Sequence, residues 1–331
     1  MRVRLLSFTD RGEALARKLA KDLGGEAARC GAPAGLADWT AAAFSQAQAM
    51  VFVGAAGIAV RAVAPHVNRK TSDPAVVVVD EAGRFAVPIL SGHLGGANDL
   101  ARRIAASCGA VPVITTATDV RGLFAADEWA KRQGCRIQNP GAIKSVSAKL
   151  LSGGTVRIHS PWPVTGAPPP GVTPSEKEGC DVLLTVRQEE GEALRLVPPI
   201  AALGVGCKKG TPQEALERAF LSLLERSLLS PLSFDKVCSI NLKRAEPGLL
   251  AFCSAHSLRL ETFSAQELRE AEGDFSSSDF VRSVTGVDNV CERSAVLGSG
   301  GALYWKKQAE NGVTMAVALA PFSPDWRWRN E

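Results

Sequence analysis

Short apolar runs alternate with helically spaced apolar residues through the first half of the chain. The runs at 3–8, 50–53 and 111–116 are typical of buried strands. Helices are predicted at about 10–23 and 124–133, and the first carries a capping-box pattern at Asp10 and Glu13. Strands that alternate with helices predict α/β units and a mainly parallel sheet.

A hairpin and a glycine-rich loop interrupt this alternation. Residues 76–79 and 85–90 flank the polar stretch 80–84, which indicates a hairpin turn. The loop 91–96 follows directly and leads into a helix predicted at about 97–108. An earlier turn at 54–57 likewise connects a strand to a helix that ends near 64.

The second half contains a segment with only weak secondary-structure patterns, called the weak segment below, and then another α/β block. In the weak segment, strands are predicted at 155–160 and 181–186, around a proline-rich loop that cannot be regular structure. The later block has predicted strands at 203–207, 237–242, 302–306 and 313–319. Helices are predicted after Pro212, from about residue 246, and at 289–297, and Ser264 with Glu267 forms a capping-box pattern.

These patterns predict three parts. We expect an N-terminal α/β domain with a mainly parallel sheet at 1–134, a small middle α/β segment at 135–199 that links the other two, and a C-terminal α/β domain at 200–331. A length of 331 residues is consistent with two or three domains.

Composition narrows the function classes. The eight cysteines form no CxxC pair and no Cys/His ligand spacing, which favours reduced thiols in the cytoplasm and argues against a zinc site. A net charge of +4 and 6% aromatic residues do not favour nucleic-acid binding. No apolar run has the roughly 20 residues that a membrane helix needs, and the N-terminus lacks the apolar core of a signal peptide.

The loop at 91–98 is the strongest candidate site. A helix that starts at a glycine-rich turn offers free backbone N–H groups and a positive dipole end to an anion, and the candidate contacts are Gly92, Gly95, Gly96 and Asn98. His93 lies within this loop, and its ordinary pKa near 6.5 suits a general base. The alternatives are a tight turn without a ligand and a histidine that only bonds locally.

Other candidate groups are less specific. Gly54, Gly57 and Arg61 could form a second anion site, unless Arg61 is simply a surface residue. The run 204–210 has G-x-G-x-x-x-G spacing, which does not fit a dinucleotide fingerprint. Its Lys208 and Lys209 remain candidate partners for anions, or are a solvated pair. Lys243, Glu246 and Glu292 could orient water or a side-chain carboxylate, or form ordinary surface ion pairs.

Two sets of stretches in this sequence resemble the CbiG family of cobalamin biosynthesis, the cobalt-precorrin-5A hydrolases. The N-terminal set is 51–61, 73–80, Ser-Gly-His-Leu-Gly-Gly-Ala-Asn-Asp-Leu at 91–100, and Thr-Thr-Ala-Thr-Asp at 115–119. The C-terminal set is 204–212, Ser239 and Ile240 with Lys243, Glu246, Gly248 and Leu249, then 290–292 and 313–318. Lys208 and Cys291 stand where the family more often has arginine and alanine.

The resemblance implies a hydrolase that opens the δ-lactone of cobalt-precorrin-5A and releases acetaldehyde to give cobalt-precorrin-5B. Cobalt would arrive within the tetrapyrrole substrate, so the family implies no cofactor and no metal site in the protein. Other corrin-pathway enzymes are candidate partners, with no nucleic acid and no membrane.

On this basis, we hypothesise that His93 activates water while the N–H groups of Gly95 and Gly96 stabilise the oxyanion, and that Glu292 with Lys243 manages protons. Two alternatives stay open. One is a non-catalytic carrier of tetrapyrroles, and the other is a nucleotide-dependent enzyme.

Overall fold

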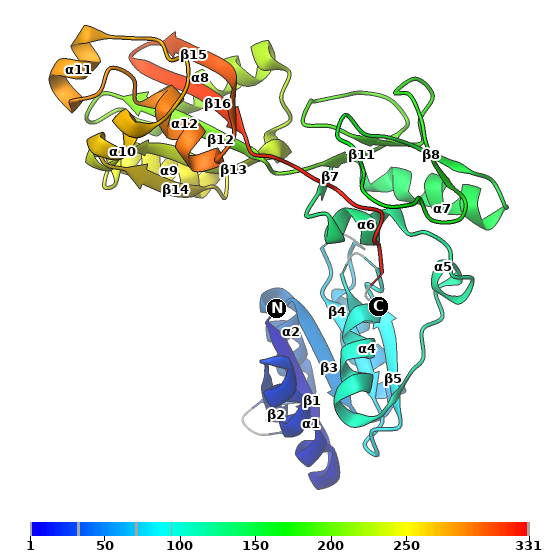
Figure 1. The fold of residues 1–331 in the computed structure, drawn as a ribbon. Coiled ribbons are helices and arrows are strands. Elements are labelled where there is room, and N and C mark those ends of the chain that lie inside the picture. The colour runs from blue at the N-terminus through cyan, green and yellow to red at the C-terminus, as the bar shows by residue number, and fades with distance from the viewer. Residues whose placement is uncertain (1, 32–33, 70–71, 94, 330–331) are drawn as a thin grey trace. The chain divides into compact units, whose positions relative to one another are not determined.

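The computed structural model describes residues 2–31, 34–69, 72–93 and 95–329. The chain divides into two compact units, Met1–Glu128 with Leu150–Ser152, and Trp129–Lys149 with Gly153–Glu331. The described residues form three sheets in which most strand pairs are parallel, with helices packed on them (Figure 1). The predicted multi-domain α/β class is confirmed.

The first unit contains a six-stranded sheet. Its strands are β1 (Val3–Ser7), β2 (Glu26–Arg29), β3 (Ala49–Val53), β4 (Ala75–Val79), β5 (Phe85–Leu90) and β6 (Val111–Pro112), in the spatial order β2-β1-β3-β4-β5-β6. Only β4 and β5 pair antiparallel, as the predicted hairpin. The carboxyl ends of β5 and β6 therefore lie at the edge where β3 and β4 begin.

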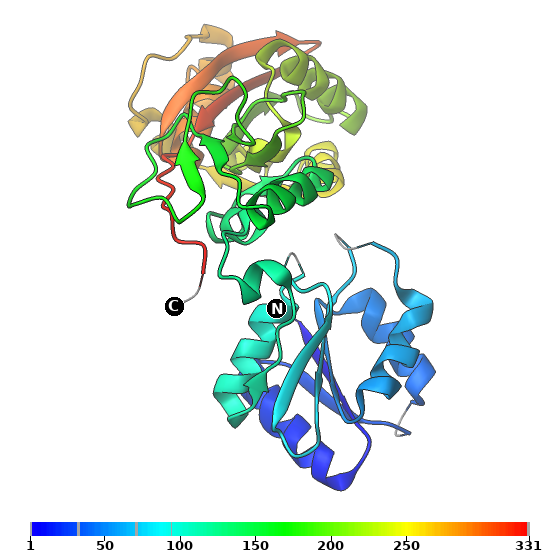
Figure 2. The ribbon, with the colours of Figure 1, turned by 90° about the vertical axis from the view of Figure 1, so that its right-hand side faces the viewer.

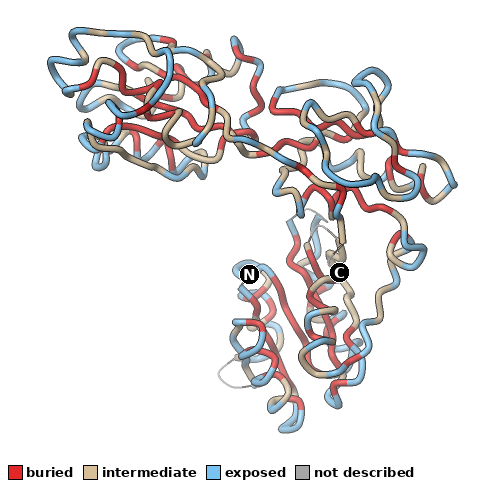
Figure 3. Tube along the Cα trace, in the orientation of Figure 1, coloured by how far each residue is buried: buried red, intermediate tan, exposed pale blue. Residues whose placement is uncertain are grey.

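Helices cover both faces of this sheet, because its central strands are apolar on both sides. Val51 and Val53 face the cluster formed with α1 (Asp10–Leu23) and α4 (Ala97–Cys108). Met50 and Phe52 point to the other face, toward α2 (Leu36–Gln46) and α3 (Ala56–Val63). Figure 2 shows these two helix layers, and Figure 3 shows the buried strands between them. The remaining elements are the 3₁₀ turn η1 (Ala64–His66), α5 (Ala117–Val120) and α6 (Ala126–Arg132).

The second unit begins with a small sheet of short strands. These are β7 (Arg136–Ile137), β8 (Val156–His159), β9 (Val172–Pro174), β10 (Val182–Leu184) and β11 (Leu194–Val197), in the order β7-β11-β10-β8-β9, with η2 (Pro140–Ala142) and α7 (Ile143–Leu151) between the first two in sequence. Only β7 and β11 pair antiparallel. The proline-rich stretch between β8 and β9 forms no helix or strand, as predicted.

The third sheet occupies the rest of the second unit. Its strands are β12 (Ala201–Cys207), β13 (Phe234–Ile240), β14 (Arg259–Phe263), β15 (Ala302–Glu310) and β16 (Val313–Leu319), in the order β14-β13-β12-β16-β15. The helical elements are α8 (Gln213–Ser227), η3 (Pro231–Ser233), η4 (Asn241–Lys243), α9 (Pro247–Ala255), α10 (Ala265–Glu270), α11 (Asp279–Thr285) and α12 (Cys291–Ser299). The predicted capping box of Ser264 and Glu267 is confirmed at α10.

Close packing against β12 explains the glycines at positions 204 and 206, near the centre of this sheet. A Cβ atom at Gly204 would lie 1.8 Å from the carbonyl oxygen of Cys291, so only glycine lets α12 pack directly on β12. Gly206 is similarly close to Thr314, at 2.5 Å from its hydroxyl oxygen. Close packing therefore accounts for the first two glycines of the run 204–210.

The C-terminal segment returns to α6. The indoles of Trp129 and Trp326 stack with centroids 5.4 Å apart, and Trp129 Nε1 donates to the Asp325 carbonyl at 2.6 Å. Gln133 accepts from the Asp325 backbone N–H at 3.0 Å. These contacts fasten the last described residues within the second unit.

Three local predictions need correction. Thr9, not Asp10, caps α1, because Thr9 is extended and its hydroxyl accepts from the Gly12 N–H at 3.0 Å. The buried strand expected at 111–116 is limited to Val111–Pro112 at the edge of the sheet, and both residues are exposed. The helix expected from Asn289 begins at Cys291, where the Asn289 side chain accepts from the Glu292 N–H at 2.9 Å.

Among the described residues, no helix combines the length and apolar character needed to cross a membrane.

Candidate functional site

The loop after β5 folds tightly around its own backbone. Ser91 has a positive φ of 56°, and a Cβ atom at Gly95 would lie 2.3 Å from the Ser91 Cβ. The Gly96 N–H donates to the His93 carbonyl at 2.9 Å, and the Asn98 N–H donates to the Gly92 carbonyl at 3.0 Å. These amides are therefore used inside the loop, and Gly96 does not offer its N–H to an oxyanion in this conformation.

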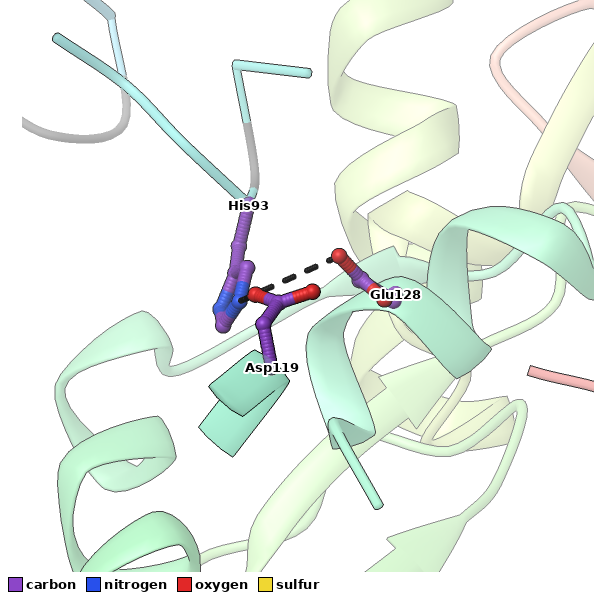
Figure 4. Close-up of side chains that lie close together, drawn as sticks. All are labelled: His93, Asp119 and Glu128. Atoms are coloured by element: carbon purple, nitrogen blue, oxygen red, sulfur yellow. Dashed lines mark hydrogen bonds and ion pairs between the residues drawn. The ribbon is translucent and has the colours of Figure 1, made fainter. Parts of the chain in front are cut away.

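The same loop places His93 among three carboxylates. Its Nε2 lies 2.7 Å from Asp119 Oδ2 and 3.9 Å from Glu128 Oε1, and its Nδ1 lies 3.5 Å from Asp127 Oδ2. Figure 4 shows His93, Asp119 and Glu128 converging from separate parts of the chain. We call these four residues, His93, Asp119, Asp127 and Glu128, the histidine–carboxylate cluster.

Sheet topology explains why these residues meet. Because β5 and β6 are parallel, the loops that follow them leave the same edge of the sheet. His93 follows β5, and Asp119 lies on α5 after β6. Asp127 and Glu128 stand in the first turn of α6.

Asp119 is held in place by three donors. Its Oδ2 accepts from Asn98 Nδ2 at 3.0 Å as well as facing His93, and its Oδ1 accepts from Arg102 at 2.6 Å. Although burial opposes ionisation, the hydrogen bonds from His93 and Arg102 hold the pKa of Asp119 below its ordinary value. Asp119 is thus a fixed anion beside the imidazole.

The carboxylates change the pKa of His93. Burial alone would lower it, but the hydrogen bond to Asp119 and the charges of Asp127 and Glu128 outweigh burial and raise the pKa above its ordinary value. Both ring nitrogens face carboxylate oxygens, so the doubly protonated imidazolium is the form that this pocket stabilises.

Glu128 is shifted in the direction opposite to that of Asp119. Burial raises its pKa to about 7, the His93 charge opposes that rise, and the charges of Asp119, Asp99 and Asp127 add to it. A histidine whose pKa is raised and a glutamate whose pKa is about 7 therefore lie side by side, an arrangement typical of acid–base catalysis.

A metal ion is the other chemistry that these ligand types allow. One ligand atom each from His93, Asp119 and Glu128 lies within 4.8 Å of the others. However, both oxygens of Asp119 already accept hydrogen bonds, and the Arg102 guanidinium at 2.6 Å would repel a cation. The cluster as folded is better suited to proton transfer than to metal binding.

The second predicted glycine turn lies at the other edge of the sheet. Gly54 follows β3, and its N–H donates to the carbonyl of Val79, the last residue of β4. His93 follows β5, which pairs with the beginning of β4. A strand of five residues, roughly 16 Å, therefore separates the two turns. Gly57 and Arg61 are exposed on α3 and are not brought to His93.

The candidate residues of the C-terminal block lie in the second unit. Lys243 pairs with Glu246 at 3.0 Å, and Lys208 and Lys209 are exposed. Glu292 is fully buried and accepts hydrogen bonds from Asn289, the backbone and hydroxyl of Ser276, and the Lys307 N–H, at 2.7–3.0 Å. Within the described residues no hydrogen bond or ion pair joins Lys243 to Glu292.

Sequence reasoning selected His93 but not its carboxylates. Asp119 ends the Thr-Thr-Ala-Thr-Asp stretch, so its signal was present in the family resemblance. Asp127 and Glu128 gave no local signal, because acidic residues are common in the first turn of a helix.

Three family profiles match successive parts of the chain. The profile described as cobalamin synthesis G N-terminal matches residues 38–119, cobalamin biosynthesis central region matches 124–197, and cobalamin synthesis G C-terminus matches 201–318. His93 and Asp119 fall in the first match, and Asp127 and Glu128 fall in the second.

Known relatives span most of the chain. The cobalt-precorrin-5A hydrolase of Salmonella typhimurium is 37% identical over 310 residues, which cover 86% of each chain. The cobalt-precorrin-5A hydrolase of Priestia megaterium is 32% identical, over 84% of this chain and 80% of that protein. A crystal structure of a cobalamin biosynthesis protein G homologue from Sulfolobus solfataricus aligns over 96% of this chain and 97% of its own, with 22% identity and a TM-score of 0.42.

Proposed function

The chain belongs to the cobalamin synthesis G family, and on that premise we propose that it is a cobalt-precorrin-5A hydrolase. The relatives that carry this name are 37% and 32% identical over most of the chain. The reaction opens the δ-lactone of the substrate with water, releases acetaldehyde and gives cobalt-precorrin-5B. The cobalt belongs to the substrate, so no residue of the protein is assigned to hold it.

The observation that carries the chemical part of this proposal is the histidine–carboxylate cluster. Lactone hydrolysis needs a group that takes a proton from water and a group that supplies a proton to the leaving oxygen. The pKa of Glu128 is raised to about 7 by burial, the pKa of His93 is raised by the neighbouring carboxylates, and the two groups lie 3.9 Å apart. Their side chains are 17% and 11% exposed, so the cluster is shielded but still reaches solvent.

Binding of the substrate's carboxylate arms is assigned more broadly. In the first unit the candidate contacts are Gly54, Gly57, Arg61, Gly92, Gly95 and Asn98, whereas the Gly96 N–H is already used within the loop; Lys208 and Lys209, in the second unit, are proposed separately as anion contacts. Arg61, Lys208 and Lys209 are exposed cations, which suits them to the acetate and propionate arms of a tetrapyrrole. Asn98 already donates to Asp119, so its contribution is to position the cluster.

We also propose the cytoplasm as the compartment. All eight cysteines are free thiols, as expected in a reducing environment. Other enzymes that act on corrin intermediates are the proposed partners, because the substrate and product of this reaction are both pathway intermediates.

The proposal is tested by incubating the protein with cobalt-precorrin-5A, trapping acetaldehyde, and measuring the corrinoid by mass spectrometry. We expect acetaldehyde from the wild-type protein and a large loss in His93→Ala. Glu26→Gln, on the exposed strand β2, is the matched control and should keep full activity. Tight binding of the corrinoid without acetaldehyde would instead identify a non-catalytic carrier.

A further inference from the structure

The surroundings of His93 make it a poor acceptor for the proton of water. Its Nε2 is 2.7 Å from Asp119 Oδ2, and its Nδ1 is 3.5 Å from Asp127 Oδ2. Asp127 is buried, and its Oδ1 has no hydrogen-bond partner among the described residues. A ring held between two such anions keeps both of its protons.

The Glu128 carboxylate, unlike the His93 ring, is available to accept a proton. Its Oε1 is 3.9 Å from His93 Nε2, which is within ion-pair distance but too far for a direct hydrogen bond. Asp119, by contrast, is satisfied by His93, Asn98 and Arg102. In the part of the chain that the structure describes, no side chain or amide hydrogen-bonds the Glu128 carboxylate, so its lone pairs can accept from a water molecule.

We propose that Glu128 is the base that activates the hydrolytic water, and that the imidazolium of His93 supplies the proton to the leaving oxygen. This assignment rests on the proposed lactone hydrolysis. The water oxygen bonds to the lactone carbonyl carbon as one water proton passes to the Glu128 carboxylate. The ring C–O bond then breaks, and the leaving oxygen takes a proton from His93. A proton returning from Glu128 to His93 restores both groups.

The electrostatics of the pocket support this division of roles. The charged groups that face Glu128 are His93, Asp99, Asp119 and Asp127, with Arg102 bound to the far side of Asp119. Burial and these carboxylates raise the pKa of Glu128 to about 7, so it is a stronger base than an ordinary glutamate and is still ionised above neutral pH.

The test measures the pH dependence of kcat/KM for acetaldehyde release in the full-length chain. Glu128→Gln should lower kcat/KM by roughly 10²–10⁴-fold with little change in KM, since a general base contributes about that factor. The activity of the wild type should rise with pH through about 7, where Glu128 ionises. This rise is the acid limb of the pH profile. The residual activity of Glu128→Gln should lack the acid limb, while Glu128→Asp should restore the acid limb and part of the rate.

Glu26→Gln, an exposed change on the same unit, is the matched control and should match the wild type. Circular dichroism and thermal unfolding establish that each variant is folded. A Glu128→Gln variant with wild-type kcat/KM, or one that is slow but keeps the acid limb, would overturn the assignment and return the base role to His93. If the wild type itself releases no acetaldehyde, the proposed function is what has failed.

Discussion

Asp119 Oδ2 lies 2.7 Å from His93 Nε2, although 26 residues separate the two in sequence. Asn98 and Arg102 hold Asp119 from its other sides, at 3.0 and 2.6 Å. The position of the Asp119 carboxylate is therefore fixed, and this carboxylate aligns the His93 imidazole. This pairing, and not the glycine loop alone, determines the protonation state of His93.

Replacing Asp119 by Asn should lower the pKa of His93, because the anion that stabilises the imidazolium is lost. His93 would then give up its proton at a lower pH. The alkaline limb of the kcat/KM profile should move to lower pH, and activity at pH 8 should fall by about 10-fold or more. An alkaline limb unchanged from wild type would show that His93 protonation does not control that limb.

Glu128→Gln should make the protein more stable at pH 8 while it removes activity. The folded-state pKa of Glu128 is about 7, above its ordinary 4.5, so the folded state binds more protons than the unfolded state between these values. Stability from this group therefore falls as pH rises through that window and is lowest above about pH 7. Removing the ionisable group should recover on the order of 2 kcal/mol at pH 8 and little at pH 4.

Urea unfolding of both proteins at the two pH values measures this difference. Equal stability at pH 8 would mean that the buried charge costs nothing, contrary to the raised pKa.

Gly95→Ala should damage the site through its loop. The added Cβ would lie 2.3 Å from Ser91 Cβ and 2.8 Å from the Ser91 carbonyl oxygen, so the backbone that carries His93 must move. We expect a loss of about 1–3 kcal/mol in stability, as for overpacking, together with a lower kcat. Gly141→Ala, where no atom lies within 4 Å of the new Cβ, is the control. Equal behaviour of the two variants would mean that the loop adapts without moving His93.

The sequence predicted those features that depend on local pattern. Strands such as β3 and β4 were found because consecutive apolar residues are buried on both faces of the sheet. β2 was not predicted, since Glu26–Arg29 has no buried residue and carries no apolar alternation, and α2 was not predicted either. His93 was selected because glycines mark a sharp turn before a helix.

Topology accounts for the parts of the site that the sequence left undetermined. Arg61 was predicted at a second anion site, and the structure places it away from His93, because β5 runs antiparallel to β4 and sends His93 to the opposite edge. Asp119 and Glu128 reach His93 because β6 runs parallel to β5, so the chain that follows β6 leaves the sheet at the same edge as the loop that carries His93. The predicted hairpin gave the direction of β5, but the pairing of β6 with β5 is not encoded in the spacing of residues along the chain, so the contacts of His93 with Asp119 and Glu128 required the fold.

Glu292→Gln should act mainly on stability. The carboxylate of Glu292 is fully buried and accepts four hydrogen bonds, from Asn289, Lys307 and two groups of Ser276. An amide offers one acceptor oxygen, and its NH₂ group would face donors, which leaves buried groups unpaired. We expect a loss of roughly 2–4 kcal/mol in the free energy of unfolding, with kcat and KM of the folded fraction close to wild type.

Urea unfolding and acetaldehyde release, measured on the same preparations, separate structure from chemistry at this position. Glu272→Gln, an exposed glutamate of the same domain, should change neither quantity. The sequence-based hypothesis that Glu292 manages protons makes the contrary prediction, a fall in kcat and a changed pH profile at nearly unchanged stability. That result would move proton transfer into the C-terminal block, because a carboxylate that serves only as a hydrogen-bond acceptor leaves no trace in the pH dependence of kcat.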